Sequence, residues 1–347
     1  MQPTRDHAAR RIQRWRWCRR LISVLLLLLV GDYFLYPHLG DSRGPIADRG
    51  ENGLWLRYHW YFGRRTDAEV EALARRLARN QIRYAYFHVR HVTAEGSLRY
   101  HYREQARRLV ARVHRAAPSV RVIAWVFAGN NGAGGLPVVD LSNEAVRREM
   151  VREARWLVDE CGFDGVQWDY EVCRSGDASL PSLLRETRAA LQTRPAGSAL
   201  ERRGAPIISV ATAVWGPPAL RRWTWSEAYL GDVAAAADQV AVMCYDTGLY
   251  LPRAYVWLVR EQAVRATRAA ARRNPRCRVL LGVPTYARGG PSHHAPSENL
   301  RMALRGVREG MSDPRADSAA FAGVALFADY TTQADEWQTY SRQWLAR

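Results

Sequence analysis

The chain has no lysine, so its excess of positive charge comes from arginine alone. In 347 residues there are 51 basic side chains against 34 acidic ones, which gives a formal net charge of +17. Outside the first twenty residues these arginines form no run interleaved with aromatic residues, the pattern expected of a nucleic-acid-binding surface. We therefore assign most of them to solvated helix faces and expect no nucleic-acid partner.

The sequence also lacks a phosphate-binding loop. Its one glycine-rich stretch, AGNNGAGG at 128–135, has neither the spacing nor the Gly-Lys-Ser/Thr ending of such a loop. This stretch follows an apolar run that we predict to be a strand. We interpret it as a flexible strand-to-helix connection over a cleft.

Cysteine is scarce as well, with five residues in the whole chain. So few cannot form the disulfide framework of a small secreted domain. Cys161 and Cys173 flank one predicted strand and would lie ~25 Å or more apart at the usual rise per residue. We predict free thiols.

Histidines are few, and they have no evident partners for a metal. His88 and His91, and likewise His293 and His294, have no acidic or cysteine companions at useful spacing in the sequence. We interpret them as solvent-facing or hydrogen-bonded imidazoles, and we expect neither a metal nor a cofactor.

The N-terminus joins a basic segment, ARRIQRWRWCRR, to an apolar one, LISVLLLLLV. We predict a cytoplasmic basic tail at 1–20, a transmembrane anchor or signal at 21–36 and a linker at 37–52. No small-x-small cleavage site follows, which favours an uncleaved anchor, and Cys18 precedes the apolar run, which argues against a lipoprotein signal. Arginines stay on the cytoplasmic side. We therefore expect a single-pass inner-membrane protein with residues after about 40 on the periplasmic or extracellular side.

Residues 53–347 alternate between β-rich apolar runs and amphipathic arginine- and alanine-rich segments. The predicted strands are 54–58, 82–89, 120–129, 164–171, 206–215, 239–246, 278–287 and 321–330. Thr66 and Ser142 are the predicted N-caps of two helices between them. Eight strands in about 290 residues predict a (β/α)8 TIM barrel. A doubly wound open sheet is the alternative, but it usually has fewer strands and a glycine-rich first turn, which RYHWYFGRR at 57–65 does not provide.

In such a barrel the chemistry takes place at the carboxyl ends of the strands. Polar and aromatic residues do gather late in the predicted strands; they are Tyr58, His88, Asp169, Glu171, Tyr245, Asp246, Tyr286, Arg288 and Asp329. Several tryptophans, namely Trp55, Trp60, Trp215, Trp223 and Trp225, include strand-end and loop positions. An indole there could stack on a sugar ring, although core packing explains a tryptophan equally well.

The fourth strand, within CGFDGVQWDYEV at 161–172, carries the most unusual pattern. Alternation places Gln167, Asp169 and Glu171 on one face, which we expect to point into the barrel. Same-face neighbours are ~6.6 Å apart, and two adjacent acids in a partly dry site cannot both ionise cheaply, so one keeps its proton near neutral pH. That is what a general acid requires. The alternative is that both acids pair with arginines at the barrel mouth.

Three motifs resemble those of the family 18 glycoside hydrolases, which are chitinase-like barrels. DGVQWDYE at 164–171 is similar to the family's Asp-Gly-x-Asp-x-Asp-x-Glu signature on strand four. MCYD at 243–246 and LGVPTYAR at 281–288 resemble the family motifs on strands six and seven. The motifs occur in the family's order on the expected strands, and the resemblance covers roughly residues 53–347.

The resemblance implies roles for individual residues. Glu171 would protonate the leaving glycosidic oxygen, and Asp169 would orient the substrate's own N-acetyl group, whose carbonyl oxygen attacks the anomeric carbon. Tyr245 and Asp246 would hold the acetamido group while charge develops. Tyr286 and Arg288 would line the sugar subsites. We add Gln167, Phe327 and Tyr58 as further substrate-binding candidates.

Three features depart from the family pattern. Gln167 replaces the middle aspartate, and its amide can hydrogen-bond Asp169 but cannot take up a proton. Phe327 replaces the tryptophan at the floor of the site on strand eight, which leaves a smaller platform under the reactive sugar. Strand three lacks a clear Ser-x-Gly-Gly.

We therefore predict a membrane-anchored glycoside hydrolase that cleaves β-linked N-acetylamino-sugar polymers with retention. Peptidoglycan or an exported polysaccharide is a more natural target for a tethered enzyme than bulk chitin. The alternatives are a catalytically silent, lectin-like glycan-binding barrel and a barrel glycosidase of another family in which Asp169 and Glu171 react directly.

Overall fold

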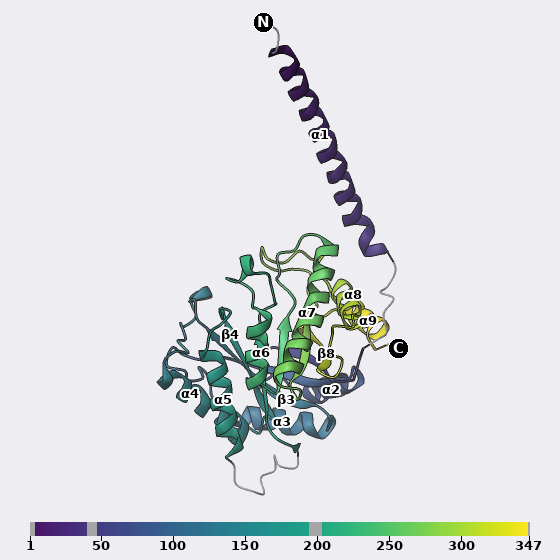
Figure 1. Ribbon diagram of the computed structural model, residues 1–347. Helices are drawn as coiled ribbons and strands as arrows, with labels where there is room; N and C mark the ends of the chain where they lie inside the picture. Colours follow the sequence, from purple (N-terminus) through teal and green to yellow (C-terminus); the bar gives the residue numbers. More distant parts are fainter. Residues whose placement is uncertain (1–3, 40–46, 194–202, 346–347) are drawn as a thin grey trace.

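The computed structural model describes residues 4–39, 47–193 and 203–345, and these form a closed parallel barrel with one long helix extending from it (Figure 1). Consecutive strands pair in chain order, and β1 closes the ring against β8 through Gly53 and Ala325. The strands are β1 (Asn52–Leu56), β2 (Ile82–His91), β3 (Arg121–Gly129), β4 (Gly165–Glu171), β5 (Ile207–Thr212), β6 (Gln239–Met243), β7 (Arg278–Pro284) and β8 (Phe321–Phe327). The (β/α)8 prediction is confirmed, and the open-sheet alternative is wrong.

The helices cover the outside of the ring. They are α2 (Asp67–Arg79), α3 (Arg103–Ala116), α4 (Glu144–Arg155), α5 (Ser179–Gln192), α6 (Glu227–Ala236), α7 (Pro252–Arg273), α8 (Leu300–Met311) and α9 (Ala334–Gln343). The long helix that extends from the barrel is α1 (Thr4–Leu35). One turn of π-helix, Trp156–Glu160, prolongs α4. Each strand–helix unit packs beside the next, because a right-handed crossover returns the chain to the neighbouring parallel strand.

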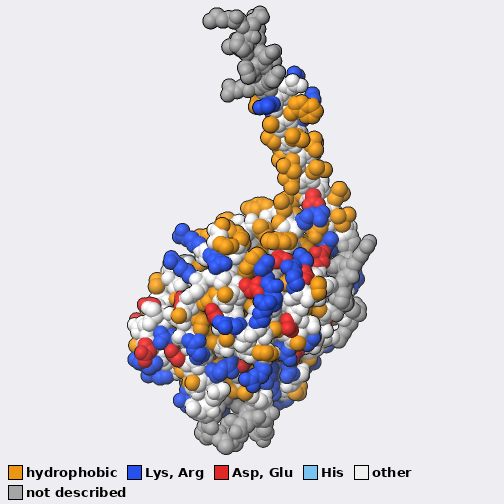
Figure 2. Space-filling view, in the orientation of Figure 1, with side chains coloured by type: hydrophobic (Ala, Val, Ile, Leu, Met, Phe, Trp, Pro, Cys, Tyr) orange, Lys and Arg blue, Asp and Glu red, His pale blue; other side chains and the backbone are white. Residues whose placement is uncertain are grey.

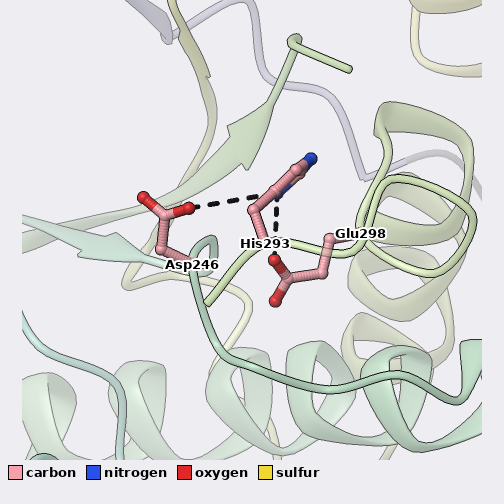
Figure 3. Close-up of side chains that lie close together, drawn as sticks. All are labelled: Asp246, His293 and Glu298. Carbon is pink, nitrogen blue, oxygen red and sulfur yellow. Dashed lines mark hydrogen bonds and ion pairs between the residues drawn. The ribbon is translucent and has the colours of Figure 1, made fainter. Parts of the chain in front are cut away.

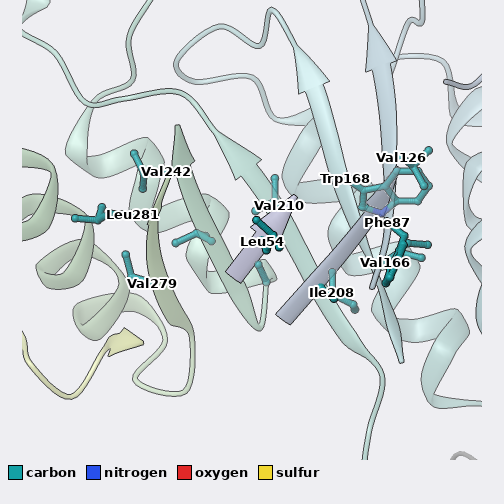
Figure 4. Packing of buried hydrophobic residues seen from close by; sticks show 14 of the residues in the cluster. Leu54, Phe87, Val126, Val166, Trp168, Ile208, Val210, Val242, Val279 and Leu281 are labelled. Carbon is teal, nitrogen blue, oxygen red and sulfur yellow. The ribbon is translucent and has the colours of Figure 1, made fainter. Parts of the chain in front are cut away.

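Two hydrophobic layers hold the barrel together. The outer layer lies between strands and helices and is rich in valine and leucine, with Trp168 among its largest side chains (Figure 4). The inner layer fills the barrel with aromatic and small residues, including Trp55, Tyr86 and Trp125. Residues of β4 alternate between the two layers as the period of two predicts.

Helix starts follow local chemistry. Thr66 caps α2 as predicted, in a capping box with Glu69. The predicted cap at Ser142 is wrong: Asn143 accepts the hydrogen bond from the Ala145 N–H, whereas the Ser142 hydroxyl turns back to Asp140. The helix therefore begins one residue later.

Strand ends differ from prediction at the mouth of the barrel. The predicted fifth strand extended to 215, but β5 ends at Thr212 because the chain then pairs with a later loop. Trp225 N donates to Val214 O at 2.8 Å, and Gly216 N donates to Trp225 O at 3.1 Å. Longer loops at this end leave room for a site.

Among the described residues, one helical segment is long and apolar enough to cross a membrane: Gln13–His38, which comprises most of α1 and the 3-10 turn after it. A secretory signal would meet the same criterion. The helix is continuous through the arginines and the apolar run, and its last turns contact the barrel. Arg253 at the start of α7 binds the carboxylate of Asp32, and the Tyr33 hydroxyl lies 3.0 Å from Nε2 of His294.

All five cysteines are free in the structure, as predicted. Cys18 is exposed on α1, and the other four are buried. Burial raises the pKa of the thiols of Cys161, Cys173 and Cys277 to about 12. These thiols remain protonated and act as small apolar side chains.

Candidate active site

Strand β4 carries three acids in two different environments. Asp164, just before the strand, is fully buried and accepts hydrogen bonds from His114 (2.8 Å), Arg203 (2.9 Å) and the Val122 N–H (2.7 Å). Burial alone would raise the pKa of Asp164, but these donors and the nearby Arg121 lower it overall. Asp164 is thus a charged structural residue at the amino-terminal end of the barrel strands, opposite the cleft.

Asp169 and Glu171 lie at the opposite end of the strand and have no such partners. Within the described part of the chain, neither carboxylate forms an ion pair with an arginine or a histidine. Asp169 accepts one hydrogen bond at Oδ2, from the Trp125 indole at 2.8 Å, and no described residue bonds its buried Oδ1. The arginine-paired alternative does not hold for these two acids.

The two carboxyl groups act on each other. The negative charge of Asp169, and then burial, raise the pKa of Glu171 well above its ordinary value. Burial raises the pKa of Asp169 to about 6, against the opposing effects of the Trp125 indole and of Glu171. Such a pair titrates as a unit. It retains one proton at neutral pH, and the order of the shifts places that proton mainly on Glu171.

A cleft of about 590 Å³ opens above Glu171. Tyr245 and Asp246 line it from the end of β6, and indoles line its other wall. The wall and rim include Trp215, Leu220, Trp223, Trp225, Leu249 and Trp257. The cleft is thus an apolar, aromatic groove with a few carboxyl and hydroxyl groups at one end, which is typical of a site for a polar ligand with flat faces.

Gln167 lies inside the barrel and does not line the cleft. Its side chain is fully buried, its Oε1 accepts from the Trp55 indole at 2.7 Å, and its Nε2 donates to Ser209 Oγ at 3.0 Å. Ser209 continues the chain to Gln239 at 2.8 Å. The amide expected to bond Asp169 is therefore occupied elsewhere, and Gln167 supports the floor of the site.

Aromatic rings pack beside the cleft, and of these rings Tyr245 lines it. Phe327 and Tyr245 stack with ring centroids 4.6 Å apart, and Tyr286 meets both rings edge-on at 6.1 and 6.5 Å. Trp55 packs edge-on against Phe327 from below at 5.7 Å. Burial raises the pKa of Tyr245 well above its ordinary value, so its hydroxyl stays protonated and can donate a hydrogen bond.

Asp246 belongs to a second cluster beside the cleft, with His293 and Glu298 (Figure 3). His293 Nδ1 lies 3.1 Å from a Glu298 oxygen and 3.9 Å from an Asp246 oxygen. Glu298 is fully buried and also accepts from the Thr247 N–H at 2.7 Å. The prediction that His293 has no acidic companions is wrong: Glu298 lies on the same loop, and the fold brings Asp246 from the loop after β6.

The ligand atoms of this cluster lie within 4.8 Å of one another, so they could hold a metal ion. The Glu298 carboxylate, however, already accepts hydrogen bonds from Thr247 and His293, and a cation would have to displace them. The arrangement instead links the loop after β6 to the loop before α8. It places Asp246 beside His293. The charge of Asp246 also raises the pKa of Glu171.

The remaining predicted residues lie around the mouth. Arg288 is exposed on the loop after β7, and Tyr58 follows β1, packed edge-on against His88 with centroids 6.5 Å apart. Neither lines the cleft beside Glu171. Asp329, also predicted at a strand end, forms an ion pair with Arg76 on α2 and is structural.

Sequence reasoning missed the residues that act through their neighbours. Trp125 holds Asp169 and stacks on His88 with centroids 4.0 Å apart. Burial lowers the pKa of His88 to about 3, so it is a neutral imidazole. Trp257 lines the cleft from the second turn of α7, where helical periodicity gave no functional signal.

Comparison with known proteins agrees with this geometry. The family model described as "Glycosyl hydrolases family 18" matches residues 60–345. No curated protein matches the chain.

Among solved structures, a family 18 chitinase from Cycas revoluta in complex with (GlcNAc)3 is similar with a TM-score of 0.58 and 13% identity, over 85% of this chain and 99% of that one. The spore cortex-lytic enzyme SleL of Bacillus cereus gives 0.54 and 11%, over 85% and 74%. A chitinase-like agglutinin from Robinia pseudoacacia gives 0.57 and 14%, over 84% and 99%. At these identities the likeness concerns the fold alone.

Proposed function

Because the chain belongs to glycosyl hydrolases family 18, we propose that it hydrolyses β-linked N-acetylamino-sugar polymers, with Glu171 as the general acid. The observation that carries this proposal is the buried carboxyl pair at the foot of an aromatic cleft, in which the charge of Asp169 keeps a proton on Glu171. A carboxylic acid that remains protonated near neutral pH is suited to protonate a leaving glycosidic oxygen.

The second part of the proposal concerns the nucleophile. The substrate's own acetamido carbonyl oxygen attacks the anomeric carbon, the bond to the leaving oxygen breaks, and that oxygen receives the proton from Glu171. Asp169 orients the acetamido group, and Tyr245 and Asp246 hold it. Water then opens the cyclic intermediate and returns a proton to Glu171, so the configuration is retained. The free Oδ1 of Asp169 supports this role, because it leaves one acceptor for the acetamido N–H.

Phe327, Tyr286 and the cleft indoles would bind the sugar rings. Phe327 stacks on Tyr245, which lines the cleft, and Trp215 and Trp223 supply further apolar faces in its lining. Arg288 and Tyr58 would reach sugars beyond the central subsite. Gln167 would keep the floor rigid through Trp55 and Ser209.

We further propose that α1 anchors the enzyme in the bacterial inner membrane. The division would be a cytoplasmic tail at 1–20, a crossing segment at 21–36, a linker at 37–52 and a catalytic domain at 53–347 on the outer side. The single apolar helix and its arginine flank support this orientation. A tethered enzyme favours peptidoglycan or an exported polysaccharide as substrate, and the likeness to a cortex-lytic enzyme is compatible with that choice.

Three proteins and two substrates test the proposal. Cleavage of N-acetylated and deacetylated oligosaccharides is compared for the wild type, Glu171→Gln and Asp169→Asn. We expect the wild type to cleave only the N-acetylated substrate and Glu171→Gln to lose ~10²–10⁴-fold in kcat, the usual contribution of a general acid. Activity that survives Glu171→Gln would refute the assignment of the acid.

The same comparison distinguishes the alternatives. If the chain is a lectin-like barrel, the wild type and Glu171→Gln will bind the oligosaccharides equally well, and neither protein will cleave them. The likeness to an agglutinin motivates this control. A glycosidase that uses both carboxylates directly would cleave the deacetylated substrate as readily as the acetylated one.

A further inference from the structure

A group of exposed hydrophobic side chains lies at the mouth of the barrel. We call it the membrane edge; it comprises Leu220, Trp223, Tyr250, Leu251 and Trp257, exposed by 53, 64, 59, 38 and 48%. These residues come from the loop after β5, the loop after β6 and the start of α7. All three segments follow the carboxyl ends of strands, so they belong to the same end of the barrel as the cleft.

Helix α1 leaves the barrel from this same end (Figure 1). Arg253 and Arg305, at the starts of α7 and α8, each place a guanidinium 4.2 Å from the centre of the buried Tyr36 ring. Asp32 binds Arg253, and Tyr33 reaches His294 in the loop before α8. Helix α1 is therefore fixed to the mouth of the barrel by its own last turns.

The length of the apolar part of α1 limits how far the barrel can lie from the bilayer. The run 21–30, which is apolar except for Ser23, has ten residues and rises ~15 Å. A hydrocarbon core of ~30 Å needs about twenty helical residues. A crossing that starts just after Arg20 must therefore also use the residues around Asp32 and Tyr36, which are the ones in contact with the barrel.

The composition of the loop after β5 is suited to contact with lipid. The loop segment 217–223, PPALRRW, combines apolar side chains with two arginines and has no acid. Arg222 lies 5.1 Å over the Trp223 ring. Tryptophan and tyrosine prefer the membrane interface, and arginines attract anionic headgroups. Figure 2 shows hydrophobic side chains continuing from α1 onto the adjoining edge of the barrel.

We propose that the membrane edge rests on the bilayer that α1 crosses, and that the cleft therefore takes glycan chains held at the surface of that bilayer. The substrate part of this inference rests on the proposed hydrolase function. Leu220, Trp223 and Trp257 belong both to the membrane edge and to the rim of the cleft. A glycan attached to a lipid would thus enter the groove directly from the membrane surface.

Fluorescent labelling tests the contact without any assay of activity. The full chain, with Cys18→Ser, carries a single polarity-sensitive dye through Leu251→Cys or, as the matched control, through Ser119→Cys before β3 at the opposite end of the barrel. The other four cysteines are buried. Each protein is reconstituted in nanodiscs of phosphatidylethanolamine and phosphatidylglycerol.

We expect the dye at position 251 to emit at shorter wavelength and to be quenched several-fold more by nitroxide-labelled lipid than the dye at 119. Equal, solvent-like emission and quenching at the two positions would overturn the proposal.

A kinetic comparison tests the choice of substrate. The same N-acetylated oligosaccharide is offered free or attached to a lipid in the bilayer, to the wild type and to a Tyr250→Ser, Leu251→Ser double variant; neither residue lines the cleft. We expect the variant to lose several-fold on the attached substrate and nothing on the free one. An equal loss on both would overturn the substrate inference. Absence of any cleavage with the lipid quenching intact would refute the hydrolase function and leave the contact surface supported.

Discussion

Asp164 lies just before β4 and Asp169 lies within it, five positions apart, and their surroundings shift their pKa values in opposite directions. Hydrogen-bond donors and the nearby Arg121 lower the pKa of Asp164 overall, against the effect of burial, whereas burial raises the pKa of Asp169. The difference lies in what the neighbouring strands and loops present: His114 and Arg203 at one end, and the Trp125 indole and Glu171 at the other. One acid stabilises the fold, and the other is available for chemistry.

Replacing Asp169 by asparagine should change the pH dependence of activity as well as its magnitude. Glu171 must be protonated to act, so activity falls as the pH rises through the pKa of Glu171. The charge of Asp169 is the largest cause of that raised pKa. Asp169→Asn removes it, so we expect the alkaline limb of kcat/KM to move to lower pH. The full pH–rate profile measures this, and an unmoved limb would contradict the coupling.

The hydrogen bond from Trp125 to Asp169 joins strand β3 to strand β4. Trp125→Phe keeps a ring stacked on His88 but removes the donor at 2.8 Å. A hydrogen bond to a charged group contributes about 1.5–3 kcal/mol, so we expect kcat/KM to fall roughly 10- to 100-fold. In a double-mutant cycle with Asp169→Asn the two losses should not add. Additive losses would show that Trp125 acts independently of Asp169.

Asp164, at the amino-terminal end of the barrel strands, should contribute to the stability of the fold. Asp164→Asn leaves His114, Arg121 and Arg203 around a buried neutral group, and breaking a buried charge pair costs about 3–5 kcal/mol. Urea unfolding at neutral pH measures the loss. Asp67→Asn, which removes a solvent-exposed partner of Arg108, should cost far less.

The contribution of Asp164 to stability should depend on pH in a definite direction. Its pKa is lowered by folding, so its stabilisation is present above the ordinary aspartate pKa and is lost as the pH falls through the lowered value. We expect the stability difference between wild type and Asp164→Asn to be largest near neutral pH and to shrink in acid. A difference that grew as the pH fell would contradict this assignment.

At the scale of the whole molecule, the proposed topology can be tested through Cys18. It is the exposed cysteine of the structure, and it lies among the arginines of α1. In intact cells we expect a membrane-permeant maleimide to label it and an impermeant one to fail. Cys18→Ser is the control that should remove the labelling. Labelling by the impermeant reagent would place the N-terminus outside and reverse the proposed orientation.

The sequence by itself determined the features that depend on local periodicity. A period of two placed Asp169 and Glu171 on the inner face of the fourth strand, and the alternation of eight apolar runs with amphipathic segments predicted the closed barrel. The three motifs led to family 18. These signals survive in the sequence because backbone geometry fixes the direction of each side chain along a strand.

Only the tertiary structure decided which side chains meet across elements. Gln167 bonds to Trp55 and Ser209 instead of Asp169. His293, in the loop before α8, lies between Glu298 of the same loop and Asp246 of the loop after β6. The docking of α1 on the barrel mouth likewise joins residues more than two hundred positions apart. Such contacts depend on loop paths and strand closure, which no local pattern encodes. For that reason the pairing of Asp169 and Glu171 on one face could be predicted from the sequence, whereas the residues that hold the pair could not.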